Sequence, residues 1–102
     1  MHKIAIVDDD RQSVERIKEL IEAVDSDAIF YTADSVESIK KFGEFDLVIL
    51  DKLLSGGLGT DHKHKFKCPV IVFSGIASEI NGEINKADVH KFIDRVVDEL
   101  RN

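Results

Sequence analysis

The segment KIAIVDDD, residues 3–10, decides the fold, because it is an uninterrupted apolar run that ends in carboxylates. Ile and Val without polar alternation are typical of a strand buried on both faces, as in a parallel sheet that helices cover on both sides. The pattern recurs at residues 47–51, where LVIL precedes an aspartate, and at residues 70–74, where VIVF precedes a serine. The sequence therefore predicts a parallel sheet with polar side chains at the ends of its strands.

The polar residues that follow these runs are candidates for one functional site. In a parallel sheet, ligands bind in the crevice outside the carboxyl ends of the strands. A fourth short segment, residues 83–85, delivers a lysine to the same edge. We therefore expect five side chains to converge there: Asp8, Asp9, Asp51, Ser74 and Lys86.

Helices are expected between the strands. Apolar residues recur at steps of three and four in residues 14–24, which predicts an amphipathic helix that begins at residue 9 or 10. Ser35 is a suitable N-cap for a second, shorter helix that ends at Gly43. The last helix is expected from residue 87 or 88 to about residue 100, packed beside the first. The strands are expected at five places: residues 3–7, 28–31, 46–50, 69–73 and 83–85.

The two later crossovers between strands are short. Seventeen residues separate Asp51 from Pro69, and residues 61–67 have almost no apolar face. Eleven residues separate Ser74 from Lys86 and must hold both a crossover and a strand, although a crossover alone usually takes about a dozen or more. We therefore expect a three-layer α/β domain whose third helix is short or frayed and whose fourth helix is a turn or absent.

The composition restricts the class of protein. A chain of 102 residues fits one domain, residues 1–102, with no effector domain, and its net charge of −6 argues against a nucleic-acid partner. A single cysteine, Cys68, excludes an internal disulfide, and the first residues enter a strand instead of a secretory signal, so we expect a cytoplasmic protein. No apolar stretch approaches the roughly 20 residues that span a bilayer, so no membrane partner is expected.

The carboxylates Asp8, Asp9 and Asp51 are candidate metal ligands. They are hard oxygen donors, and Mg²⁺ binds through one or two carboxylates, several waters and a phosphoryl oxygen. The set therefore predicts Mg²⁺ in preference to Zn²⁺. The alternative is that residues 8–10 only cap the following helix against its dipole.

In order and spacing, these motifs resemble the receiver domain of bacterial response regulators, the CheY-like superfamily of two-component signalling. The shared pattern is a strand followed by two Asp, a strand followed by one Asp, a strand followed by Ser or Thr, and a late Lys. Residues 30–35 also resemble the family's second strand and turn, and residues 54–59 resemble its loop after the acceptor Asp. The resemblance covers nearly the whole chain and implies a flavodoxin-like, doubly wound, five-stranded parallel sheet.

The resemblance also implies roles for the candidate residues. Asp51 would accept a phosphoryl group from a phosphohistidine of a histidine kinase or a histidine phosphotransfer protein, with Mg²⁺ bound. The backbone carbonyl of Leu53 would be a further metal ligand, Lys86 would contact the phosphoryl oxygens, and Ser74 would turn inward to hydrogen-bond them. The aspartyl phosphate would hydrolyse by self-catalysis. We therefore expect a stand-alone phosphoacceptor that signals through protein contacts, and not a turnover enzyme.

Two positions depart from the family pattern. Glu83 stands where the family's switch has an aromatic residue, and Ala87 stands where the family has Pro. Because the crossovers are short, the strands at residues 47–50 and 70–73 are expected to expose an apolar face, through which the chain could form a homodimer. The alternative function is a degenerate receiver that acts as a phosphorylation-independent interaction module. A metal-dependent phosphohydrolase is disfavoured, because no second acid stands two residues after Asp51.

Overall fold

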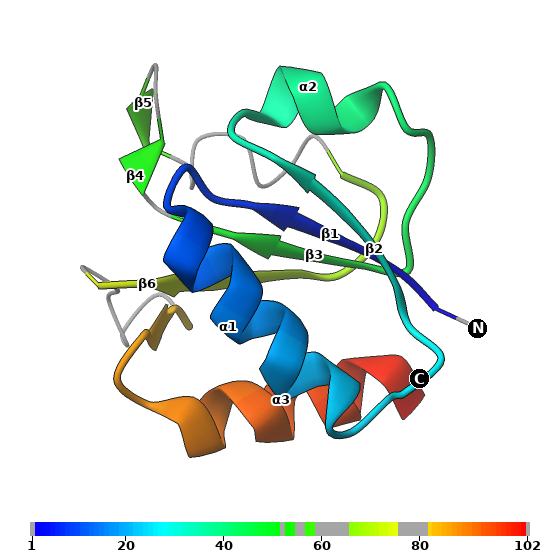
Figure 1. The fold of residues 1–102 in the computed structure, drawn as a ribbon, viewed down its shortest axis with the longest axis vertical. Helices are drawn as coiled ribbons and strands as arrows, with labels where there is room; N and C mark the ends of the chain where they lie inside the picture. The colour runs from blue at the N-terminus through cyan, green and yellow to red at the C-terminus, as the bar shows by residue number, and fades with distance from the viewer. Residues whose placement is uncertain (1, 52, 55–56, 59–65, 76–81, 102) are drawn as a thin grey trace.

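A five-stranded parallel sheet forms the centre of the molecule, with helices on both faces (Figure 1). The computed structural model describes residues 2–51, 53–54, 57–58, 66–75 and 82–101. The strands of the sheet are β1 Lys3–Val7, β2 Ile29–Ala33, β3 Leu47–Leu50, β6 Val70–Ser74 and β7 Ile84–Asn85. Their order is β2-β1-β3-β6-β7, and each neighbouring pair is parallel. The predicted parallel sheet is confirmed.

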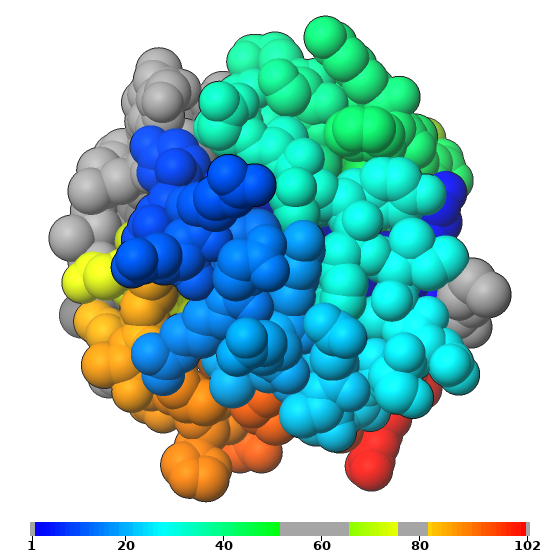
Figure 2. Space-filling view, viewed as in Figure 1, coloured from blue at the N-terminus to red at the C-terminus, as the bar shows by residue number. Residues whose placement is uncertain are grey.

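The described part of the chain contains three helices: α1 Arg11–Glu22, α2 Val36–Lys40 and α3 Val89–Arg101. α1 and α3 lie together on one face of the sheet, and α2 lies on the other (Figure 1). In the space-filling view, the surface of α1 lies between the β2–α2 segment and the residues that precede α3 (Figure 2). Among the described residues, none of the helices has the length and apolar character that a membrane span requires.

Side-chain caps determine where α1 and α2 begin. Asp10 has extended backbone angles, φ −96° and ψ 110°, and its side chain accepts a hydrogen bond from Gln12 N. Ser35 caps α2 in the same way by accepting a hydrogen bond from Ser38 N, as predicted. Gly43 follows α2 with a φ of 95°, a left-handed angle that favours glycine. The sequence therefore located the cap of α2 correctly, and it placed the start of α1 one or two residues too early, at the cap instead of at Arg11.

The larger core cluster lies between the sheet and the α1/α3 layer. Phe92 of α3 is 0% exposed and stacks on Phe73 of β6, with ring centroids 4.1 Å apart and ring planes at 18°. Ile17 and Ile21 of α1 belong to the same cluster, as does Val96 of α3. The apolar stripes of the two helices therefore meet on one face of the sheet, which confirms that they pack side by side.

The opposite face of β3 and β6 is also buried, which corrects one expectation. By strand alternation, four side chains of these strands point to this face, and all are at most 7% exposed: Val48, Leu50, Val70 and Val72. Phe66 and Cys68, from the segment before β6, pack against this second cluster together with α2. The prediction of an open apolar face is wrong, because a segment without helical periodicity helps to cover it. The proposed homodimer through that face loses its basis.

The crossover after β3 begins with a small hairpin. β4 Leu53–Leu54 and β5 Gly57–Leu58 pair antiparallel in a separate two-stranded sheet. Most of the expected third and fourth helices falls on residues 59–65 and 76–81, which lie outside the described residues. The described parts of these two crossovers contain no helix, in line with the predicted reduction.

Candidate functional site

β1 and β3 hold two buried carboxylates at the same edge of the sheet. Asp8 and Asp51 directly follow these paired strands, and they are 5% and 8% exposed. Backbone hydrogen bonds extend the sheet beyond the strand ends, because Asp8 N donates to Ala33 O at 3.0 Å and Asp51 N donates to Val7 O at 2.9 Å. The backbone of each aspartate is therefore fixed by the neighbouring strand.

Asp9 completes a group of three carboxylates. One oxygen from each of Asp8, Asp9 and Asp51 lies within 4.8 Å of the other two, and Asp9 is exposed whereas its partners are buried. Such a set of oxygen donors, open on one side, fits a hard divalent cation that keeps several water molecules. Leu53 begins β4 two positions after Asp51, and the role of its carbonyl as a ligand stays a prediction.

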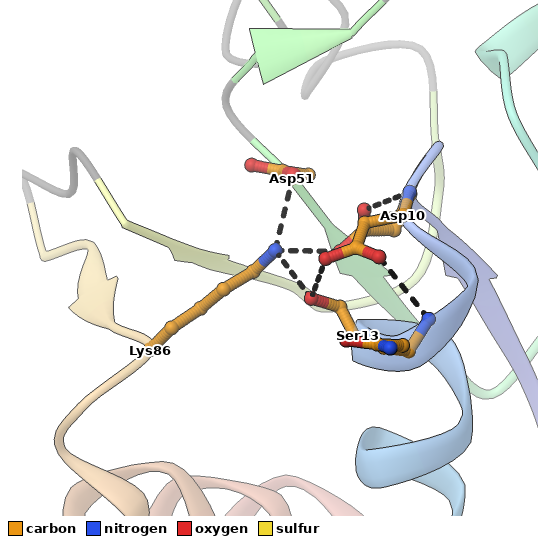
Figure 3. A network of polar contacts seen from close by, with 6 residues as sticks. Asp10, Ser13, Asp51 and Lys86 are labelled. Atoms are coloured by element: carbon orange, nitrogen blue, oxygen red, sulfur yellow. Dashed lines mark hydrogen bonds and ion pairs between the residues drawn. The ribbon is translucent and has the colours of Figure 1, made fainter.

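Lys86 brings a positive charge to these acids from a distant part of the chain (Figure 3). It directly follows β7, and its Nζ donates to Asp8 Oδ2 at 2.9 Å and to Asp51 Oδ2 at 3.3 Å. Burial lowers the pKa of the ammonium, but the hydrogen bond to Asp8 and the charges of Asp8 and Asp51 outweigh this effect, so the pKa is raised. Lys86 is therefore a cation at neutral pH.

The surroundings favour the charged form of Lys86, but they disfavour the charged form of Asp8. Burial raises the pKa of its carboxyl, and the nearby charge of Asp51 raises it further. Hydrogen bonds from Asp10 N, at 2.9 Å, and from Lys86 lower the pKa of Asp8 only in part. Two buried carboxylates with one lysine leave an excess of negative charge, so the site favours the binding of a further cation.

Ser13, on the first turn of α1, is a contact of Lys86 that sequence reasoning missed. Lys86 Nζ donates to Ser13 Oγ at 3.0 Å, and Ser13 Oγ donates to Asp10 Oδ2 at 3.0 Å (Figure 3). The spacing of Asp10 and Ser13 is visible in the sequence, but by itself it indicates only a helix cap. The lysine contact is tertiary, because residues 13 and 86 are 73 positions apart.

Ser74 lies next to the backbone of Lys86. It ends β6, is 1% exposed and pairs with Asn85 of β7, and its carbonyl accepts a hydrogen bond from Lys86 N at 3.1 Å. Glu83, just before β7, is 4% exposed, so a buried carboxyl stands where the family has its switch aromatic. The position of Ser74 agrees with the predicted convergence, whereas the role of its hydroxyl stays a prediction.

Comparison with solved structures assigns the class of the fold. The chain has the fold of a response-regulator receiver domain, as its motifs predicted. The BeF3-activated receiver domain of DrrB is similar with a TM-score of 0.78 and 21% identity, over 100% of this chain and 99% of that one. The BeF3-activated N-terminal receiver domain of Klebsiella pneumoniae RstA gives a TM-score of 0.71 and 23% identity, over 98% and 99% of the two chains.

A third solved structure has a higher sequence identity. The response regulator MaeR, bound to beryllium trifluoride, is 28% identical with a TM-score of 0.64, over 79% of this chain and 72% of that one. No protein-family model and no curated protein matches the sequence. The receiver fold is therefore established by structure and by the order of the motifs together.

Proposed function

We propose that this chain is a response-regulator receiver that accepts a phosphoryl group on Asp51 from a histidine kinase or a histidine phosphotransfer protein. The observation that carries the proposal is the Lys86 ammonium, which lies 3.3 Å from Asp51 Oδ2 and 2.9 Å from Asp8 Oδ2 within the group of carboxylates. The neighbours support it, since DrrB and RstA are BeF3-activated and MaeR is bound to beryllium trifluoride, which imitates a phosphoryl group.

In the proposed reaction, a carboxylate oxygen of Asp51 attacks the phosphorus of the donor phosphohistidine. The P–O bond forms as the P–N bond breaks, and the donor imidazole is the leaving group. Mg²⁺ held by Asp8, Asp9 and Asp51, with the carbonyl of Leu53, would neutralise negative charge on the phosphoryl oxygens. Lys86 donates hydrogen bonds to the same oxygens, and its charge opposes the repulsion between the carboxylate and the phosphoryl group.

The phosphorylated state would signal and then decay. The Ser74 hydroxyl hydrogen-bonds the phosphoryl group and moves the end of β6 toward it, which changes the surface offered to a protein partner. Water then attacks phosphorus and Asp51 leaves as the carboxylate, so the acceptor is regenerated without a separate enzyme. The chain acts on itself, as a phosphoacceptor and not as a turnover enzyme.

A phosphorylation-independent interaction module is the second candidate function, and Glu83 favours it. This buried carboxyl, 4% exposed, replaces the aromatic partner that the family uses in its switch. A receiver without that partner would transmit phosphorylation differently or not at all. The acids argue against this candidate, because an interaction module gains nothing from a buried carboxyl such as Asp8, whose burial raises its pKa.

Intact-mass measurement after incubation with acetyl phosphate distinguishes the two candidates. With Mg²⁺ present, the wild type is expected to gain one phosphoryl group and Asp51→Asn none, because the variant lacks the nucleophile. Asp27→Asn is the matched control, since this exposed aspartate precedes β2 at the other end of the strands. A chelator is expected to abolish the gain. If the wild type gains no mass with Mg²⁺, the phosphoacceptor proposal is wrong and the interaction module remains.

A further inference from the structure

The hydroxyl of Ser13 joins the ammonium of Lys86 to the cap of α1. It accepts a hydrogen bond from Lys86 Nζ at 3.0 Å and donates one to Asp10 Oδ2 at 3.0 Å. The other oxygen of Asp10 accepts from Gln12 N at 3.1 Å, which is the capping bond of the helix. A chain of hydrogen bonds therefore runs from Lys86 through Ser13 and Asp10 into the backbone of α1 (Figure 3).

Within the described part of the chain, the ammonium of Lys86 has as many acceptors in reach as it has N–H donors. An ammonium group has three N–H donors and no acceptor. Three acceptors of the described residues lie within reach of Lys86 Nζ: Asp8 Oδ2 at 2.9 Å, Ser13 Oγ at 3.0 Å and Asp51 Oδ2 at 3.3 Å. Two of these acceptors belong to the charged group that would hold metal and phosphoryl. Ser13 is the neutral acceptor, on the first turn of a helix packed into the core.

The direction of the bonds fixes the orientation of the Ser13 hydroxyl. Lys86 can only donate, so the oxygen of Ser13 must accept from it and its proton must go elsewhere. The Ser13 hydroxyl donates that proton in a hydrogen bond to Asp10 Oδ2, at 3.0 Å. With its proton directed at Asp10, Ser13 keeps its lone pairs directed at the ammonium of Lys86.

We propose that Ser13 is a positioning residue that holds the Lys86 ammonium over Asp51. For its effect on the reaction, this inference rests on the proposed phosphoacceptor function. When the phosphoryl group forms on Asp51, the ammonium exchanges a carboxylate oxygen for a phosphoryl oxygen, while its bond to Ser13 is kept. Ser13 thus limits the search of a long, flexible side chain whose stem would otherwise sample many rotamers.

A role in capping alone is the competing explanation for Ser13. Its hydroxyl supports Asp10, and that support would stabilise α1 whether or not Lys86 were present. α2 offers a matched comparison, because Ser38 stands three residues after the Ser35 cap and its Oγ accepts from Ser35 Oγ at 2.9 Å. A cap role predicts similar results for Ser13→Ala and Ser38→Ala, with no change at Lys86.

The test compares Ser13→Ala, Ser13→Thr and Ser38→Ala with the wild type in two measurements. The first follows the ¹H–¹⁵N signal of the Lys86 ammonium by NMR in metal-free protein. We expect the signal to be visible in the wild type, Ser13→Thr and Ser38→Ala, and to shift and exchange faster with water in Ser13→Ala. The second is the rate of phosphorylation by acetyl phosphate with Mg²⁺. That rate should fall about fivefold in Ser13→Ala, since one charge-assisted hydrogen bond is lost, and recover in Ser13→Thr.

The outcomes separate this inference from the proposed function. An unchanged Lys86 signal and a rate equal to that of Ser38→Ala would overturn the positioning role, whatever the thermal stability of the variant. If the wild type takes up no phosphoryl group, the proposed function is wrong, but the NMR signal still decides whether Ser13 holds Lys86. Should Ser13→Ala fail to fold, Asp10→Asn replaces it. The asparagine keeps an oxygen for the cap but offers Ser13 an amide donor, so the Lys86 signal should again shift.

Discussion

The carboxylate of Asp8 occupies the least favourable place for a charge in the described part of the site. Burial and the charge of Asp51 raise the pKa of Asp8, so its carboxyl holds a proton more tightly in the folded protein than in the unfolded chain. The contribution of Asp8 to stability therefore falls as the pH rises from the ordinary value of 3.8 through the raised pKa. At neutral pH, without metal, the ionised Asp8 destabilises the fold.

Removal of the negative charge of Asp8 should stabilise the metal-free protein. We expect Asp8→Asn to raise the free energy of unfolding by ~1 kcal/mol at pH 7. The cost of burying the charge and the repulsion from Asp51 both disappear, and together they outweigh the lost ion pair with Lys86. The amide oxygen can still accept from Asp10 N. The measurement is urea denaturation with a chelator and with Mg²⁺. The wild type should gain stability from Mg²⁺, and the variant should gain much less. A lower midpoint for the variant in chelator would contradict the prediction, and Asp27→Asn controls for the loss of one surface charge.

At the scale of an element, α3 depends on one aromatic residue. Phe92 is 0% exposed and stacks on Phe73, and it joins α3 to both the sheet and the cluster that contains α1. The helix also follows Lys86 by only two residues. Its docking therefore holds the lysine at the site as well as closing one face of the core.

Truncation of Phe92 should cost far more than truncation of an exposed phenylalanine. We expect Phe92→Ala to lower the free energy of unfolding by ~3–5 kcal/mol, a large share of the typical 5–15 kcal/mol of a domain. Phe42→Ala is the control, because Phe42 is 49% exposed and makes a tilted ring contact with Tyr31 at 5.2 Å. Thermal and urea unfolding measure both variants. Equal losses would show that the core does not depend on the Phe92 stack.

At the scale of the whole molecule, the sheet order predicts a gradient of stability. β1 and β3 are bonded on both sides and buried on both faces apart from Lys3, whereas β2 is an edge strand with exposed residues. We expect the amides of residues 4–7 and 47–50 to exchange only through global unfolding, and those of β2 to exchange earlier by local opening. Hydrogen exchange followed by NMR measures this order. Faster exchange in β3 than in β2 would be incompatible with the sheet order.

The sequence predicts the strands well, and it predicts that Asp8 and Asp51 follow the carboxyl ends of two of them, because each of these features depends on a local pattern. The runs at residues 3–7, 47–50 and 70–73 are apolar throughout, and the acid or hydroxyl after each is adjacent in the chain. The burial of the second sheet face could not be predicted, because Phe66 and Cys68 show no periodicity. The Ser13 contact was missed for a similar reason, since nothing local relates the start of α1 to the end of β7.

The shortest strand of the sheet has a mechanical consequence. β7 has two residues, and it is tied to β6 by the Ser74–Asn85 pairing and by the bond from Lys86 N to Ser74 O at 3.1 Å. Because the backbones of Ser74 and Lys86 are joined in this way, we expect a displacement of one residue to move the other. Only Ala87 and Asp88 separate Lys86 from α3. We therefore expect a displacement at the end of β6 to reach the first turn of α3, which would link the surface of that helix to the state of the carboxylates.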